Sequence, residues 1–383
     1  MIIPIVGLFA QPDLYGQVIL LSTMILVIMG VAGFGQQRSV LYFKADAGQA
    51  SHVAVVVGIG CAVVLAALTV GLFSAFGQSV PPLIWAAAVA NVIHLLVTTQ
   101  ARAFQAFRSF TILRLSLHIF RGLLVLPALL WWGSIELYLI AELLCVILAL
   151  ALQAPQLIKI FRETASVTQE NIRRAVHIGG PVMVQILALM VINHFDKFII
   201  ESRLGAADLA AYGFVFSLIS SMTFLNTFLA MRYEVGIYQA KGLLAVRQNV
   251  MGYFFMSAIL HLAWVPILCG IYYALFLFSP HLGFYPYLFV LLSLGQIAFN
   301  MTHCFSHMFT KLDIGWVLLI VMPIIAVISI VLNTYGVPRF GIAGAALSFA
   351  ISNSVFLVIM TGVSVFMMKR ALQKDAQTGQ AVP

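Results

Sequence analysis

Blocks of about 20 consecutive apolar residues recur along the chain, and they constrain its fold more than any other feature. A helix of that length crosses the roughly 30 Å of hydrocarbon in a membrane. Apolar residues make up 62% of the chain and charged residues 8%, whereas a soluble domain carries about a quarter charged residues. An all-α polytopic membrane protein is therefore predicted, with spans at 16–35, 52–74, 81–101, 112–132, 135–156, 176–200, 209–231, 250–277, 286–304, 315–333 and 341–367.

The positive charges gather on one side of these spans. Alternate connections, together with the C-terminal tail, hold 16 of the 20 Lys and Arg residues, and the opposite connections hold only Arg203 and Arg339. Cytoplasmic loops are enriched in Lys and Arg, so the C-terminus is expected in the cytoplasm. The net charge of +8 has this origin. No basic face alternates with aromatic residues, and nucleic-acid binding is therefore not expected.

Residues that carry metal or nucleophilic chemistry are sparse. The four cysteines lie in apolar segments without a CxxC pair and are expected to be small buried side chains. His52, His261 and His281 are expected to be interfacial or packing residues. No nucleophile, metal cluster or carboxylate pair emerges, so we expect no enzyme and no bound metal or cofactor.

The two halves of the chain repeat an order of short motifs. Residues 13–16 (DLYG) open one span, and residues 208–213 (DLAAYG) open another. Further on, residues 103–108 (AFQAFR) correspond to residues 304–309 (CFSHMF) at a similar spacing. Such a repeat predicts two pseudo-symmetric six-helix lobes around a central cavity, one formed by residues 1–165 and the other by residues 166–383.

The first lobe lacks most of its opening helix. About 20 apolar residues precede Asp196 in the second lobe, but only residues 1–10 stand at the matching place in the first. Ten helical residues rise about 15 Å, which is half of a crossing. We expect a truncated or misassigned start, so that the lobe has a stub and five complete spans.

Several of these motifs resemble, in order and spacing, the polysaccharide-transporter family of the multidrug/oligosaccharidyl-lipid/polysaccharide exporter superfamily. The family includes flippases of lipid-linked oligosaccharides such as O-antigen. The resemblance covers nearly the whole chain and rests on Pro4 with 13–16 (DLYG), on 196–200 (DKFII) with 204–206 (LGA) and 212–213 (YG), and on 341–346 (GIAGAA). The missing start is a departure, because the first helix lines the lateral opening of the first lobe in that family.

The resemblance implies a function. It implies a flippase that moves a polyprenyl-diphosphate-linked oligosaccharide across the bacterial inner membrane for polysaccharide and lipopolysaccharide biosynthesis, by alternating access. Membrane lipids, a polysaccharide polymerase and chain-length proteins are the further partners it implies. The prolines Pro127, Pro181, Pro266 and Pro323 interrupt spans and allow the bends that such movement uses.

Candidate substrate contacts lie on one face of the span 112–132. Arg114, His118 and Arg121 follow the spacing i, i+4, i+7, and Arg121 lies about 10 Å deeper than Arg114. Arg binds phosphate oxygens with two parallel hydrogen bonds, so the row suits a diphosphate. In the alternative reading, Arg114 reaches the headgroups and Arg121 pairs with a neighbouring acid.

Further polar residues lie on one face of other spans. Asn91 and His94, and in the second half Asn300, are candidate cavity-lining residues, although hydrogen bonds between helices explain them equally well. Arg38 and Arg232 end corresponding spans. Each is a candidate phosphate contact, or a cytoplasmic charge of the ordinary kind.

Two acids within spans could couple transport to an ion. Glu142 and Asp196 qualify, because a carboxylate in a nonpolar environment can take up and release a proton as access alternates. In the alternative, Asp196 pairs with Lys197 or with an arginine of the other lobe, and Glu142 neutralises Arg121. A second functional hypothesis is a small-molecule or drug exporter of the same superfamily, although such carriers of cations would favour acids in the cavity.

Overall fold

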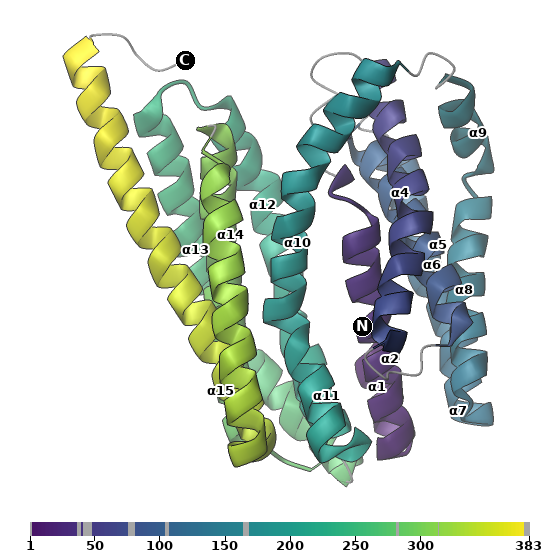
Figure 1. Ribbon diagram of the computed structural model, residues 1–383. Coiled ribbons are helices and arrows are strands. Elements are labelled where there is room, and N and C mark those ends of the chain that lie inside the picture. Colours follow the sequence, from purple (N-terminus) through teal and green to yellow (C-terminus); the bar gives the residue numbers. More distant parts are fainter. Residues whose placement is uncertain are drawn as a thin grey trace. The chain divides into compact units, whose positions relative to one another are not determined.

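Every regular element that the computed structural model describes is a helix (Figure 1). It describes residues 2–36, 40, 48–75, 81–103, 107–163, 168–280, 283–312 and 314–378. The predicted all-α fold is therefore confirmed for these residues. The helices are α1 (Ile2–Phe9), α2 (Pro12–Ala32), α4 (Gly48–Ala75), α5 (Pro82–Ala103), α6 (Phe107–Phe120), η1 (Arg121–Val125), α7 (Leu126–Trp132), α8 (Ile135–Ala151), α9 (Ala154–Glu163), α10 (Gln169–Leu204), α11 (Ala206–Ser220), α12 (Met222–Gln239), α13 (Leu243–Phe278), α14 (Pro286–Lys311) and α15 (Trp316–Thr378).

Nine helical stretches in the described part of the chain are long and apolar enough to cross a membrane. The chain is thus a multi-pass membrane protein. The eleven predicted spans differ from this number for two reasons. The helix α8 has only 17 residues, and α15 contains both of the last two predicted spans. The cytoplasmic position of the C-terminus stays a prediction.

The chain forms two compact units. One contains Phe9–Met190, and the other contains Ile3–Leu8 together with Val191–Pro383, of which residues 379–383 lie outside the described part. The long helix α10 contributes to both, and the short α1 packs in the second unit, where Ser279 Oγ donates to the carbonyl of Leu8 over 2.9 Å. The repeat-based lobe boundary at residue 165 and the central cavity stay predictions.

The helix α5 is the central element of the first unit, because it packs against α2, α4, α6 and α8. Its buried positions include the small residues Ala87, Ala88 and Ala101. Between membrane helices there is no hydrophobic driving force, so close packing of small side chains supplies much of the attraction. These alanines allow neighbouring helices to approach α5 closely.

A π-helical turn interrupts the helical stretch that begins with α6. The turn η1 begins at Arg121, and the N–H of Leu126 donates to the carbonyl of Arg121, five residues earlier. Pro127 follows directly. It has no N–H and its ring would crowd the carbonyl of Leu123, so the regular α-helical hydrogen-bond pattern is disturbed at this point. The wider turn accommodates the proline and positions Arg121 at its first residue.

The helix α14 is the central element of the second unit and packs against α11, α12, α13 and α15. Its partner α15 reverses direction at Gly341, whose φ of 59° and ψ of −144° belong to a region that only glycine adopts readily. The two arms meet so closely that a Cβ on Gly344 would lie 2.1 Å from the carbonyl oxygen of Gly336. The last two predicted spans therefore form a helical hairpin.

Candidate substrate and coupling sites

The first candidate site is an ion pair in the unit formed by Phe9–Met190. Arg121 Nε donates to Glu142 Oε2 on α8 over 3.0 Å, and Arg121 Nη2 donates to Glu142 Oε1. The same Nη2 donates to Asn91 Oδ1 on α5 over 3.3 Å. The side chains of Arg121 and Glu142 are 27% and 8% exposed. The pairing that the sequence left open is therefore present, and a phosphate contact of Arg121 stays a prediction.

The rest of the cationic row is accessible. Arg114 and His118 are both exposed, one turn apart on α6. The guanidinium carbon of Arg114 lies 5.9 Å from the centroid of the Phe110 ring. The row therefore divides into a paired inner arginine and two exposed outer residues. Contact of Arg114 and His118 with a substrate stays a prediction.

The candidates on α5 are engaged in contacts between and within helices. Asn91 and His94 are buried; Asn91 Nδ2 donates to the carbonyl of Ala87 over 2.9 Å. His94 Nε2 lies 3.1 Å from the carbonyl oxygen of Leu113 on α6. These contacts favour the alternative in which the polar residues hold α5 and α6 together.

The paired candidates at the ends of two spans are only partly described. Arg38 lies outside the described residues. Arg232, in α12, is exposed, and its guanidinium carbon lies 5.7 Å from the centroid of the Tyr233 ring. A phosphate contact and a simple topological role both stay open for Arg232.

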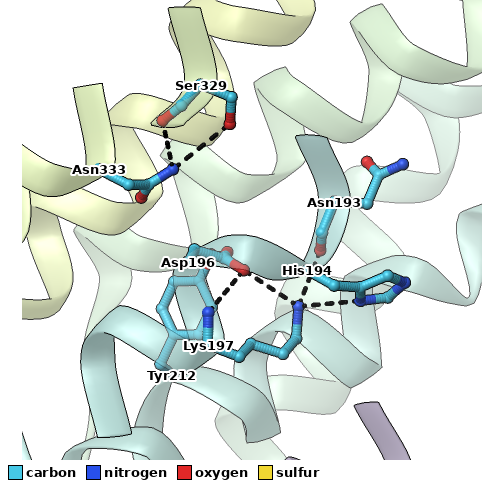
Figure 2. A network of polar contacts seen from close by, with 7 residues as sticks. All are labelled: Asn193, His194, Asp196, Lys197, Tyr212, Ser329 and Asn333. Carbon is cyan, nitrogen blue, oxygen red and sulfur yellow. Dashed lines mark hydrogen bonds and ion pairs between the residues drawn. The ribbon is translucent and has the colours of Figure 1, made fainter. Parts of the chain in front are cut away.

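The second candidate site is a buried network around Asp196 on α10 (Figure 2). Asp196 Oδ1 accepts from the backbone N–H of Lys197 over 2.8 Å and from Lys197 Nζ over 3.4 Å. The hydroxyl of Tyr212, on α11, donates to Asp196 Oδ2. Asp196 is 1% exposed and Lys197 is 3% exposed. The carboxylate is therefore held by a cation of its own chain, as the alternative reading expected.

The ammonium of Lys197 has further partners in the same network. It donates to the carbonyl of Asn193 over 2.9 Å and lies 3.4 Å from His194 Nδ1. It also lies 3.7 Å from the centroid of the Phe216 ring, a contact that favours a cation. Figure 2 also includes Asn333 of α15, whose Nδ2 donates to the carbonyl of Ser329 over 2.9 Å. An external ion at Asp196 would have to displace Lys197.

A third network, around His261 on α13, was not predicted as a site. The ring is fully buried; Nδ1 lies 2.6 Å from the carbonyl oxygen of Ser257, and Nε2 lies 3.2 Å from that of Met222 on α12. Asn300 Nδ2 on α14 lies 2.9 Å from the same Nε2. Gln296 Nε2 donates to Asn300 Oδ1 over 3.3 Å. His261 is thus a packing residue that joins three helices, and Asn300 belongs to its network.

The spacing of Ser257 and His261 contains a signal that the sequence prediction did not use. These two residues are four apart, and so are Gln296 and Asn300, which the sequence already placed on one face. Each pair therefore lies on one helical face, as expected of polar residues that bond across a membrane bundle. No group of three or more His, Cys, Asp and Glu side chains that could hold a metal occurs among the described residues.

Solved transporter structures share this fold. One is an inward-facing multidrug resistance MATE family transporter of the MOP superfamily, with a TM-score of 0.72 and 14% identity over 96% of this chain and 94% of that one. A eukaryotic MATE transporter has a TM-score of 0.64 and 12% identity, over 95% of this chain and 91% of that one. A MOP superfamily transporter from Pyrococcus furiosus has a TM-score of 0.58 and 13% identity, over 96% of this chain and 88% of that one.

The chain therefore has the fold of the MATE transporters of the MOP superfamily. At 12–14% identity, these likenesses establish the fold alone. No protein-family model matches the chain, and no curated protein matches it.

Proposed function

We propose that this protein is a carrier that moves a polyprenyl-diphosphate-linked oligosaccharide across the bacterial inner membrane by alternating access. Its fold supports a transporter, because the solved structures that share it are transporters. The motif resemblance described above supports the lipid-linked glycan as substrate. A polysaccharide polymerase and chain-length proteins would then act on the same pathway.

The choice of an anionic substrate rests on the pairing of the two carboxylates that lie within the spans. Glu142 is paired with Arg121 and Asp196 with Lys197, so neither carboxylate presents a free negative charge to a cargo. Arg114 and His118 are exposed on α6, where Arg114 presents positive charge and the imidazole of His118 offers a hydrogen-bonding group. A diphosphate needs cationic partners with several hydrogen-bond donors, which a guanidinium supplies. A pocket of altered polarity has a precedent in this fold, since the Pyrococcus furiosus transporter is described by the words "reverse polarity of binding pocket suggests different function".

A multidrug exporter is the second candidate. It is favoured by the neighbours described as multidrug resistance MATE family transporters. A cationic drug needs an acidic partner in the membrane. In this chain such a partner would become available only if Arg121 or Lys197 released its carboxylate.

Glu142 and Asp196 remain the candidate ion-coupling residues under this proposal. Each is held by a cation of the chain, so uptake of a proton or sodium ion would weaken an existing pair. Such an exchange can bias two conformations if the pair is stronger in one of them. Asp196→Asn should then reduce transport driven by an ion gradient and leave gradient-independent exchange less affected.

A reconstituted assay tests the substrate. The full chain is placed in liposomes with a fluorescent polyprenyl-diphosphate oligosaccharide, and its transfer between leaflets is measured. Arg114→Gln with His118→Gln should slow transfer about tenfold or more, as expected for lost hydrogen bonds to a charged group. Arg203→Gln, an exposed cation at the end of α10, is the matched control and should leave the rate unchanged.

Two results would contradict the flippase. One is transfer at the rate of protein-free liposomes. The other is equal loss in the control and in the Arg114/His118 variant. Accumulation of a cationic dye in the same liposomes, abolished by removing a carboxylate, would support the exporter instead.

A further inference from the structure

A cavity of about 240 Å³ lies between three helices of the second unit. Its walls are apolar and come from α13 (Val250, Met251 and Phe254), α14 (Phe305) and the C-terminal arm of α15 (Val365 and Met368). The rings of Phe254 and Phe305 meet with their centroids 5.7 Å apart. The cavity is thus a slot for a chain of apolar groups.

Two cations stand at one end of the slot. Arg247 is the first lining residue of α13, and Lys369 is the last lining residue of α15. Short connections and the bend at Gly341 reverse the chain three times between α13 and the C-terminal arm of α15. The two helices therefore run in opposite directions, and both cations lie at the same end. From Arg247 to Phe254 the slot extends about 10 Å along the helix.

The other polar groups of the lining are already satisfied. Ser364 Oγ donates to the carbonyl of Met360 over 2.6 Å, and Thr361 Oγ1 donates to that of Leu357 over 2.8 Å. Arg247 and Lys369 are exposed, and neither makes an ion pair with any residue that the structure describes. The slot therefore offers positive charge at one end and apolar groups along the rest.

The slot also opens on the apolar outer surface of its unit. Met251 and Val365, which line it, are 38% and 51% exposed, and the adjoining Phe255 and Phe366 are exposed as well. An apolar outer surface in a multi-pass protein faces acyl chains. A molecule from the bilayer can thus enter the slot from the side.

We propose that this slot is a binding site for an anionic phospholipid of the membrane. One acyl chain lies along Met251, Phe254 and Val365, and the phosphate at its head binds Arg247 and Lys369. Charge complementarity selects this occupant, because a zwitterionic lipid leaves two cations without net compensation. The site is separate from the proposed substrate contacts on α6, which belong to the other unit.

Native mass spectrometry of the full chain in a non-ionic detergent tests the site. The protein is titrated with phosphatidylglycerol and with phosphatidylcholine that carries the same acyl chains. A basic residue near anionic lipid contributes about 1 kcal/mol, which is about fivefold in affinity. Arg247→Gln with Lys369→Gln should therefore weaken the first phosphatidylglycerol about 25-fold and phosphatidylcholine much less, because the choline already neutralises its phosphate.

Two further variants separate charge and shape. Arg370→Gln removes the neighbouring exposed cation, which does not line the slot, and should change neither lipid. Val365→Trp fills the slot and should weaken both lipids. Equal binding of the two lipids to the unchanged protein would overturn the proposal. So would full binding to the Arg247/Lys369 variant or to Val365→Trp, or an equal loss in Arg370→Gln.

Discussion

Arg121 and Glu142 join the π-helical turn η1 to α8 through two hydrogen bonds between one guanidinium and one carboxylate. The partners are not equivalent. A carboxylate left alone in a nonpolar site can bind a proton and become neutral, whereas arginine stays charged in proteins. The pair therefore protects the structure mainly against an unpaired arginine.

Glu142→Gln should destabilise the protein more than Arg121→Gln. Leaving one charge of a buried pair uncompensated costs about 3–5 kcal/mol, and we expect about 3 kcal/mol for Glu142→Gln because Arg121 keeps some exposure. Arg121→Gln should cost about 1–2 kcal/mol, the penalty of a lost hydrogen bond to a group that can be protonated. Thermal unfolding in detergent measures both.

The double variant Arg121→Gln with Glu142→Gln is the control for this pair. It removes both charges and should be more stable than Glu142→Gln alone, since replacing both partners is often close to neutral. Strictly additive losses would show that the two residues contribute independently, contrary to the geometry.

Gly344→Ala should open the hairpin of α15. The added Cβ would lie 2.1 Å from the carbonyl oxygen of Gly336, so the two arms would have to separate. Overpacking costs about 1–3 kcal/mol and occasionally more, and backbone against backbone leaves little room to adjust. We expect a loss of about 3 kcal/mol in thermal unfolding.

Gly362→Ala supplies the comparison within the same arm. Apart from its chain neighbours and the backbone of its own helix, no atom lies within 4 Å of a Cβ at this position, and alanine is favoured over glycine in a helix by up to about 1 kcal/mol. The variant should therefore match or exceed the stability of the unchanged protein. A similar loss in both variants would indicate a general intolerance of α15 and not a close contact at Gly344.

His261→Leu should cost about 1–3 kcal/mol. Nε2 of a neutral imidazole either donates to the carbonyl of Met222 or accepts from Nδ2 of Asn300, so the substitution leaves one of these groups without its partner in a fully buried place. An unsatisfied buried group costs about 1–3 kcal/mol. His118→Leu is the control, since that imidazole is exposed and its loss should change stability by less than about 0.5 kcal/mol. Comparable unfolding midpoints for the two variants would contradict the network.

Tyr212→Phe should destabilise the Asp196 network by about 1.5–3 kcal/mol, the contribution of a hydrogen bond to a charged group. The ring stays, so packing against Phe216 is preserved. Tyr335→Phe removes a hydroxyl from a side chain that is 62% exposed and should leave the unfolding midpoint unchanged. An unchanged unfolding midpoint for Tyr212→Phe would show that this hydroxyl does not stabilise the Asp196 network.

Membrane thickness made most helices predictable. The span 250–277 falls within α13, and the span 81–101 falls within α5 apart from its first residue, because only a run of apolar residues of that length can cross hydrocarbon. Apolarity alone does not fix where a helix ends, since a helix continues into water when its sequence permits. Thus α10 begins at Gln169, seven residues before the predicted span, and includes the charged Arg173 and Arg174.

Side-chain contacts between helices were harder to predict from the sequence than the helices themselves. The candidate stripe of Arg114, His118 and Arg121 was correctly placed along one stretch, but the π turn at Arg121 has no counterpart in a spacing of i, i+4, i+7. His261 meets Met222 and Asn300, each 39 residues away in sequence. Such distances depend on how helices rotate against each other. In a chain that is apolar on all faces, the pattern gives little information about that rotation.

The π turn lets the chain carry one extra residue without changing how the segments on either side of it face each other. A π turn is one residue longer than the α turn it replaces, so it corresponds to a one-residue insertion in a helix. Deleting Gly122 would turn the bond from the Leu126 N–H to the Arg121 carbonyl into an ordinary i→i−4 bond. The segments before and after the turn would keep their register, and Arg121 would stay on the side of Glu142. Related chains that lack this one residue are therefore expected to keep both members of the pair.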